Sequence, residues 1–116
     1  RHDGMFVIAS EVGNDVTLPA ITEVYHEISR LQNELVPKDE LRLVKNYLHG
    51  SFLRGADGPF ALAELVKAAS DFGLGMDFYH HYLETIKNVT AEEIRDLAVK
   101  YLQPDSLIRL IVGKKV

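Results

Sequence analysis

Apolar side chains recur at helical spacing along most of the chain. The clearest stripe comes first and consists of Ile21, Val24, Ile28, Leu31 and Leu35. These residues are three or four positions apart, which is the spacing of one face of an α-helix. Four later stretches share the pattern: Leu41, Val44, Leu48, Phe52; Leu62, Leu65, Val66, Ala69; Phe78, Tyr82, Leu83, Ile86; and Ile94, Leu97, Ala98, Tyr101, Leu102. The sequence therefore predicts five helices.

Proline and glycine residues mark where several of these helices begin and end. Pro37 is followed by Asp39 and Glu40. This order predicts a helix start, because proline is tolerated in a first turn and the free N–H groups there favour negative charge. The stretch 55–58, which begins and ends with glycine, predicts a break, and Pro59 predicts the start of the third helix.

The strongest local signal is a capping box before the last helix. Thr90 and Glu93 have the spacing at which each side chain can bond to the other residue's backbone N–H, and Val89 and Ile94 have the spacing of a hydrophobic staple. For the first helix the sequence leaves three candidate caps, which are Asn14, Asp15 and Thr17.

Two short apolar runs flank the helices, at 5–9 and 107–112. Their lengths and flanking residues are typical of strands. The order strand, five helices, strand predicts an α+β fold, a helix-rich two-layer sandwich with helices covering a sheet. Two strands alone make a poor sheet, so we expect the missing strands to precede Arg1 or to come from a second molecule. Residues 1–116 are thus predicted to be a single, partial domain.

Composition narrows the classes of partner and compartment. Hydrophobic residues make up 47% of the chain and charged residues 26%, and the formal net charge is −4, as in ordinary soluble domains. Without a dense run of Lys and Arg, a nucleic-acid surface is not expected, and no apolar stretch is long enough to span a membrane. The chain has no cysteine, which excludes disulfides and suits the cytosol and the periplasm equally.

The histidines do not have the spacing of a zinc site. They are His2, His26, His49, His80 and His81. The stretch 81–84, His-Tyr-Leu-Glu, begins like the zinc motif His-x-x-Glu-His, but Thr85 stands where the second histidine belongs. His26-Glu27 also lacks a partner histidine and is expected to lie on a surface helix. His80 and Glu84 are one turn apart, a spacing that would support a simple hydrogen bond or ion pair, and we expect a solvated helix face there. We therefore predict no metal ligand in this chain.

Other catalytic patterns are incomplete as well. Gly50 and Gly55 have the outer spacing of a phosphate-binding loop, but Ala56-Asp57 replaces the required Lys-Ser/Thr. We expect these glycines to lie where two helices meet. Gly73-Leu74-Gly75 lacks the third glycine of a dinucleotide loop and predicts a helix C-cap instead.

The paired acids Glu92-Glu93 fall in a helix first turn, where capping explains them better than acid–base catalysis. No Gly-x-Ser-x-Gly sequence is present to carry a nucleophilic serine. No catalytic residue is predicted.

Taken in order, several landmarks resemble a known family. They are Glu23-x-x-x-Glu27-x-x-x-Leu31, Val36-Pro37-Lys38-Asp39-Glu40-Leu41-x-x-x-Lys45, Ile86-Lys87-Asn88-Val89-Thr90-Ala91-Glu92-Glu93-Ile94, Ala98-x-x-Tyr101-Leu102 and Val112-Gly113. Their order is similar to the second half of a domain of the insulinase, or pitrilysin, zinc metallopeptidases. It also resembles mitochondrial processing peptidase subunits and the core proteins of the respiratory cytochrome complex. The resemblance spans about Gly4 to Gly113.

The resemblance implies a role without chemistry. Members of the family pair two homologous domains around a peptide-sized chamber. One domain holds zinc with His-x-x-Glu-His and a distal Glu, and the other lacks zinc and grips the substrate. The Lys45-x-x-Leu48 helix looks more like the zinc-free domain. The substrate-contacting Arg and Tyr of that domain lie upstream of the run at 5–9, and Arg1 is too close to that run to match, so no family site residue carries over.

The expected function is that of a non-catalytic half-domain in the proteolysis of peptides, which helps to form the substrate chamber. The expected partners are the catalytic peptidase domain or subunit, which would hold the zinc, the peptide substrate, and a second copy of the chain paired along an open sheet edge. The alternatives are a non-peptidase homologue that acts as an assembly scaffold and an unrelated helical binding module. The sequence leaves open which of these is right, and whether the parent protein is an active peptidase.

Overall fold

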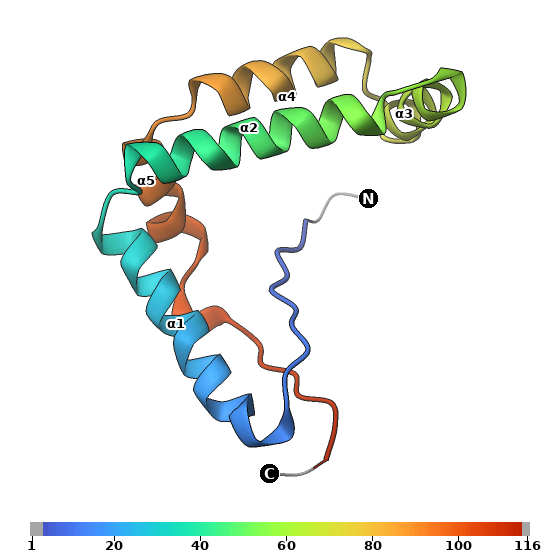
Figure 1. Ribbon diagram of the computed structural model, residues 1–116. Coiled ribbons are helices and arrows are strands. Elements are labelled where there is room, and N and C mark those ends of the chain that lie inside the picture. Colours follow the sequence, from blue (N-terminus) through green and yellow to red (C-terminus); the bar gives the residue numbers. More distant parts are fainter. Residues whose placement is uncertain (1–3, 115–116) are drawn as a thin grey trace.

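The computed structural model describes residues 4–114, and this part of the chain is all-α. It contains the helices α1 (Thr17–Asn33), α2 (Lys38–Gly55), α3 (Pro59–Asp71), α4 (Asp77–Asn88) and α5 (Ala91–Tyr101), with single 3-10 turns at Asn14–Val16 and Pro104–Ser106 (Figure 1). The five helices expected from the apolar stripes are confirmed.

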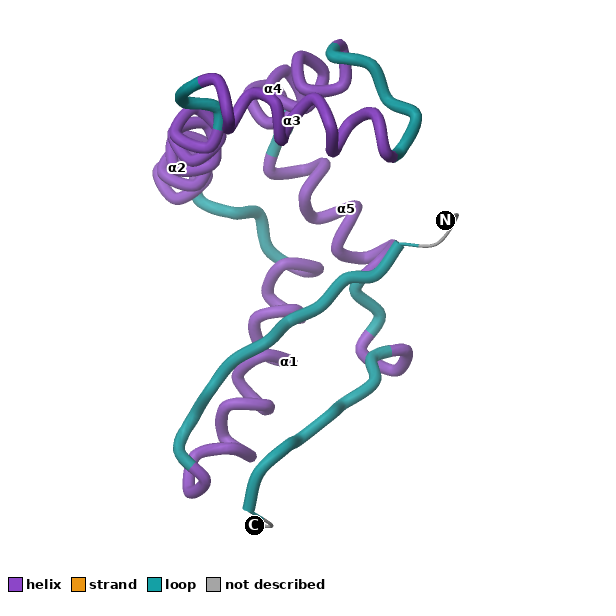
Figure 2. The backbone as a smooth tube through the Cα atoms, turned by 90° about the vertical axis from the view of Figure 1, so that its right-hand side faces the viewer, coloured by secondary structure: helices purple, strands orange, loops and turns teal. Residues whose placement is uncertain are grey.

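The predicted α+β sandwich is wrong, because residues 4–114 contain no strand. The runs 5–9 and 107–112 are extended segments before the first helix and after the last, and both are loops in Figure 2. They have the composition of strands, but a strand in a sheet needs a neighbouring backbone whose N–H and C=O groups pair with its own. Neither run has such a neighbour among the described residues. Their side chains are exposed, apart from half-buried Leu107. Ile108 is 95% exposed and Val112 is 88% exposed.

The helices form two arms set at an angle to each other (Figure 1). In one arm α1 packs against α5, and in the other α2 packs against α4, with α3 at the far end. Within the described residues no extensive helix contact joins the arms. The chain passes between them at 34–37 and at Val89–Thr90. The radius of gyration is 17.6 Å, whereas a compact domain of this length has about 13 Å.

The α1–α5 arm has a small apolar contact sealed by one polar side chain. Ile28 and Ala98 are only 2% and 4% exposed. The side-chain amide of Gln32 donates hydrogen bonds to the backbone oxygens of Ala98, at 3.3 Å, and Leu102, at 2.6 Å. Carbonyls at a helix C-terminus have no partner within the helix, so Gln32 satisfies the end of α5 from the neighbouring helix.

The arm formed by α2 and α4 also combines an apolar contact with a polar side chain that bonds to the end of the neighbouring helix. The ring of Phe52 lies 5.6 Å from that of Tyr79 and 5.9 Å from that of Tyr82, measured between centroids. At the other end of the pair, Lys45 Nζ donates to the backbone oxygens of Lys87, at 3.0 Å, and Val89, at 2.6 Å. The C-terminal half of α2 thus meets the N-terminal half of α4, so the two helices are antiparallel.

Two of the predicted helix boundaries are confirmed in atomic detail. Thr90 is the N-cap of α5, and its hydroxyl oxygen accepts from the Glu93 N–H at 3.2 Å. The Glu93 carboxylate accepts from the Thr90 hydroxyl at 3.2 Å. Gly73 has a φ of 69°, which favours glycine, and Leu74 N–H bonds to the Ala69 oxygen at 2.8 Å as α3 ends.

The predicted cap of α1 is wrong. Val16 occupies the N-cap position and makes no side-chain capping bond. A 3-10 turn over Asn14–Val16 leads directly into the helix, and the Thr17 hydroxyl donates to the Gly13 oxygen at 3.3 Å. The 3-10 turn over Asn14–Val16 thus runs directly into α1, and α1 begins without a side-chain cap.

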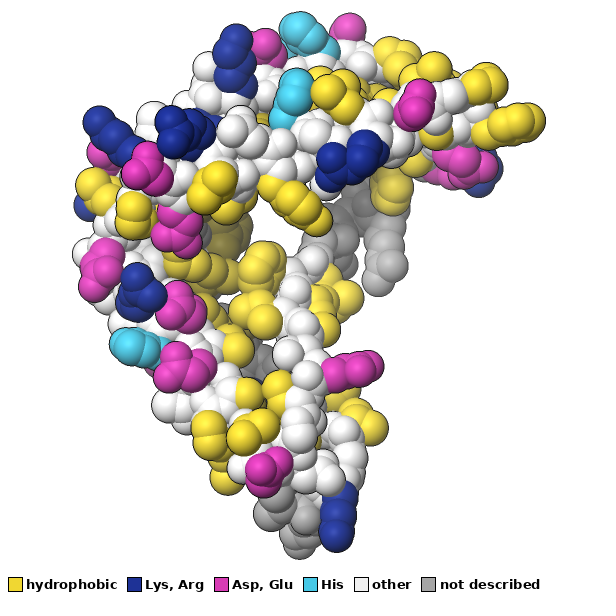
Figure 3. Space-filling model, in the orientation of Figure 1, with side chains coloured by type: hydrophobic (Ala, Val, Ile, Leu, Met, Phe, Trp, Pro, Cys, Tyr) yellow, Lys and Arg dark blue, Asp and Glu magenta, His cyan; other side chains and the backbone are white. Residues whose placement is uncertain are grey.

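Most of the apolar surface of the chain remains open to solvent. The accessible area is 9871 Å², about 3,500 Å² more than the roughly 6,400 Å² of a compact monomer of this mass. Ile28, Ala69 and Ala98 are the buried apolar residues of the described part. Hydrophobic side chains cover parts of both arms and surround the hollow between them (Figure 3).

Candidate functional site

The described histidines do not converge on a metal site, although His49 and His80 lie along the same groove. His26 lies on α1, His49 on α2, and His80 and His81 on α4, and all four are exposed; His2 lies outside the described residues. Residues 4–114 contain no group of three or more His, Asp or Glu side chains placed to hold a metal ion. His80 and Glu84 are exposed, as expected for a solvated helix face, and they do not pair with each other. Glu84 accepts from the side-chain amide of Asn88 at 3.4 Å.

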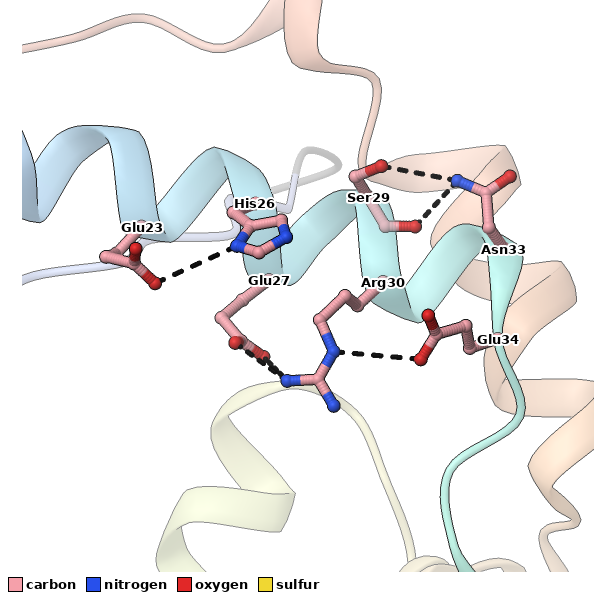
Figure 4. A network of polar contacts seen from close by, with 7 residues as sticks. All are labelled: Glu23, His26, Glu27, Ser29, Arg30, Asn33 and Glu34. Atoms are coloured by element: carbon pink, nitrogen blue, oxygen red, sulfur yellow. Dashed lines mark hydrogen bonds and ion pairs between the residues drawn. The ribbon is translucent and has the colours of Figure 1, made fainter.

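The acidic and basic residues of α1 pair with one another along its exposed face (Figure 4). Arg30 Nη1 lies 3.0 Å from Glu27 Oε1, Arg30 Nε lies 3.7 Å from Glu34 Oε2, and His26 Nδ1 lies 3.9 Å from Glu23 Oε2. The hydrogen bond and charge of Glu27, with a smaller contribution from Glu34, raise the pKa of Arg30 above its usual value. Exposed pairs at this spacing add little to stability, so this network is a solvated helix surface.

The remaining catalytic patterns lie in ordinary helical positions. Gly55 is the last residue of α2, where two helices meet as expected, but Gly50 is inside α2, so that expectation is wrong for Gly50. Neither glycine belongs to a loop that can cradle a phosphate. Glu92 and Glu93 lie in the first turn of α5, where Glu93 takes part in the cap. None of these residues lines a shared cleft.

An open groove that the sequence patterns did not identify lies between α2 and α4. Its volume is about 680 Å³, within the range of ligand pockets. The residues that line it are Lys38, Leu41, Arg42, Lys45, Asn46 and His49 from α2, and His80, Leu83, Glu84, Ile86 and Lys87 from α4. The α2 residues of the groove are spaced so that they lie on one face of the helix. This spacing can be read from the sequence, but it does not indicate which other helix packs beside that face.

Exposed aromatic and aliphatic side chains on α2 and at the two ends of α3 are candidate contacts for a partner. Phe60 is 88% exposed, Phe72 is 73% exposed, and Leu43 and Tyr47 are each 67% exposed. Large exposed apolar patches mark interaction surfaces. No helix within the described residues is long and apolar enough to cross a membrane.

Comparison of the chain with protein-family models, with curated proteins and with solved structures finds no match.

Proposed function

We propose that this chain is a non-catalytic half-domain of an insulinase-like zinc metallopeptidase. Its role is to complete the wall of the substrate chamber and to dock on the catalytic domain or subunit. In this proposal the zinc and the residues that cleave the peptide belong to that partner, and this chain contributes shape and contact area.

The observation that carries the proposal is the set of large apolar side chains that are open to solvent. Phe60, Phe72 and Leu43 are 88%, 73% and 67% exposed, and the total accessible area is about 3,500 Å² greater than that of a compact monomer of this mass. Exposure of many large apolar side chains to water is costly. It is consistent with a chain that becomes buried against a larger partner.

The helical landmarks of the resemblance support the same proposal. The Glu23, Glu27 and Leu31 landmark lies on α1, α2 begins directly after Pro37, and Thr90 caps α5. The all-α architecture departs from the α+β fold of the family, so the proposal rests on the helices and on the open surface.

Co-expression tests the proposal. The chain is expressed with the product of an upstream or adjacent reading frame that encodes His-x-x-Glu-His, and association, zinc content and cleavage of a fluorogenic peptide are measured. We expect a stoichiometric complex that cleaves the peptide, and much slower cleavage by the partner alone. A complex that binds no zinc and cleaves no peptide indicates the scaffold instead, and the absence of any such partner contradicts the proposal.

A matched pair of variants locates the docking surface. Tyr47→Glu adds a charge to an exposed apolar position of α2 and should weaken the complex by about tenfold, because a buried unpaired charge costs more than the roughly 1.4 kcal/mol that this change represents. Asp39→Asn changes an exposed polar position of the same helix and should leave affinity within about twofold.

A further inference from the structure

We infer that the groove between α2 and α4 binds an acidic peptide segment that also carries apolar side chains. The inference concerns a surface of this chain alone and does not depend on the proposed peptidase assembly. It is carried by the charge, the apolar lining and the length of the groove.

The charge of the groove is opposite to that of the whole chain. Four cationic side chains and one carboxylate line it, a balance of +3 with the imidazoles neutral, whereas the chain carries −4. Within residues 4–114, Lys38 and Lys87 have no carboxylate within 4.0 Å. Arg42 lies 3.4 Å from Asp39, but both side chains are largely exposed, so water weakens that pair. The groove thus presents cations that an acidic ligand can neutralise.

The inner lining of the groove is apolar. Leu41 on α2 and Leu83 and Ile86 on α4 are half-buried and line the cavity together with the cations. Transfer of apolar side chains from water onto such a surface is favourable in proportion to the area covered. A ligand with only negative charges leaves this lining wet, and a ligand with only apolar groups leaves the cations unpaired.

Lys45 links the two walls of the groove. Its ammonium group is satisfied by the backbone oxygens of Lys87 and Val89 at the end of α4. Lys38 and Lys87, from opposite walls, remain available to a ligand, and His49 and His80 add ring nitrogens that can form hydrogen bonds. This division of roles gives the groove a preformed shape, which lowers the entropic cost of binding.

The length of the groove favours a peptide over a single small anion. Its α2 wall runs from Lys38 to His49, about 16 Å at 1.5 Å per residue. That length accommodates about five residues of extended chain at roughly 3.3 Å each. Peptides dock in grooves between helices by placing apolar anchors inside and polar groups at the rim.

Fluorescence anisotropy tests the inference with a labelled peptide of about ten residues that contains equal numbers of Glu and Leu. Matched peptides carry Gln or Lys in place of Glu. We expect saturable binding of the Glu peptide that weakens as salt rises, and binding at least about tenfold weaker for the Gln and Lys peptides. The double variant Lys38→Glu/Lys87→Glu should weaken binding of the Glu peptide by about tenfold or more.

The control double variant Lys67→Glu/Lys100→Glu makes the same change in net charge outside the groove and should change affinity less than twofold. Circular dichroism verifies that each variant folds. If Lys38→Glu/Lys87→Glu unfolds α4, the neutral variant Lys38→Gln/Lys87→Gln takes its place. Equal losses in the groove and control variants, or equal affinity for the Glu and Lys peptides, overturn the inference. So does full displacement of the peptide by millimolar phosphate, which would make the groove a small-anion site.

Discussion

Removal of the α5 cap gives the sharpest test of how local structure stabilises this chain. In Thr90→Ala the Glu93 N–H loses its acceptor at 3.2 Å, and the Glu93 carboxylate loses the hydroxyl that it contacts. Replacement of a threonine N-cap by alanine costs about 1 kcal/mol. Because α5 provides Ala98 to the small buried contact with α1, fraying of its first turn should lower the stability of the whole arm.

Urea unfolding, followed by circular dichroism, measures this loss. With a dependence on denaturant of about 2 kcal/mol per molar, a loss of about 1 kcal/mol lowers the midpoint by about 0.5 M. Thr22→Ala is the matched control. Thr22 lies within α1 and its hydroxyl donates to the Leu18 oxygen at 3.1 Å, inside a helix where alanine is favoured by up to about 0.7 kcal/mol. Its midpoint should stay constant or rise.

Equal effects of the two substitutions would refute the reasoning, because both remove the same hydroxyl and methyl groups and differ only in helix position. An unchanged midpoint in Thr90→Ala would also refute it, since it would mean that the Thr90–Glu93 bond contributes nothing in solution.

Three further predictions follow from other parts of the chain. The dialysed chain should contain no stoichiometric zinc and cleave no peptide, and metal analysis that finds one zinc per chain, lost in His81→Ala, contradicts this. Light scattering over a dilution series should show self-association through the exposed apolar surface, and a chain that remains monomeric at high micromolar concentration excludes it. Gln32→Met should destabilise the α1–α5 arm by about 1 to 2 kcal/mol in urea unfolding, because the backbone oxygens of Ala98 and Leu102 lose their donor; an unchanged midpoint contradicts it.

Helices and some of their ends could be predicted because their signals are local. The stripe from Ile21 to Leu35 predicts α1 from spacing alone, and Thr90 with Glu93 predicts the start of α5. Gly73 predicts the end of α3 because glycine, which has no Cβ, adopts the positive φ of a helix end at no steric cost. Each prediction depends on residues less than four turns apart.

The strands and the groove depend on distant parts of the chain. The run at 107–112 has strand composition, but composition does not supply the backbone that must pair with it. The groove residues Lys38 and Lys87 are far apart in sequence and line one cavity only because α2 and α4 pack antiparallel. No spacing within either helix indicates that pairing.

The two-armed arrangement has a consequence for the mechanics of the chain. Both connections between the arms, at 34–37 and Val89–Thr90, leave the α2–α4 arm at the same end, because α2 begins there and α4 ends there. We expect two tethers at one end to act as a hinge, so that the angle between the arms can vary at little energetic cost. A partner that touches both arms would fix that angle, and one that touches a single arm would not. Since the chain has no cysteine, one engineered cysteine on each arm can carry a pair of spin labels whose distance distribution reports the opening directly.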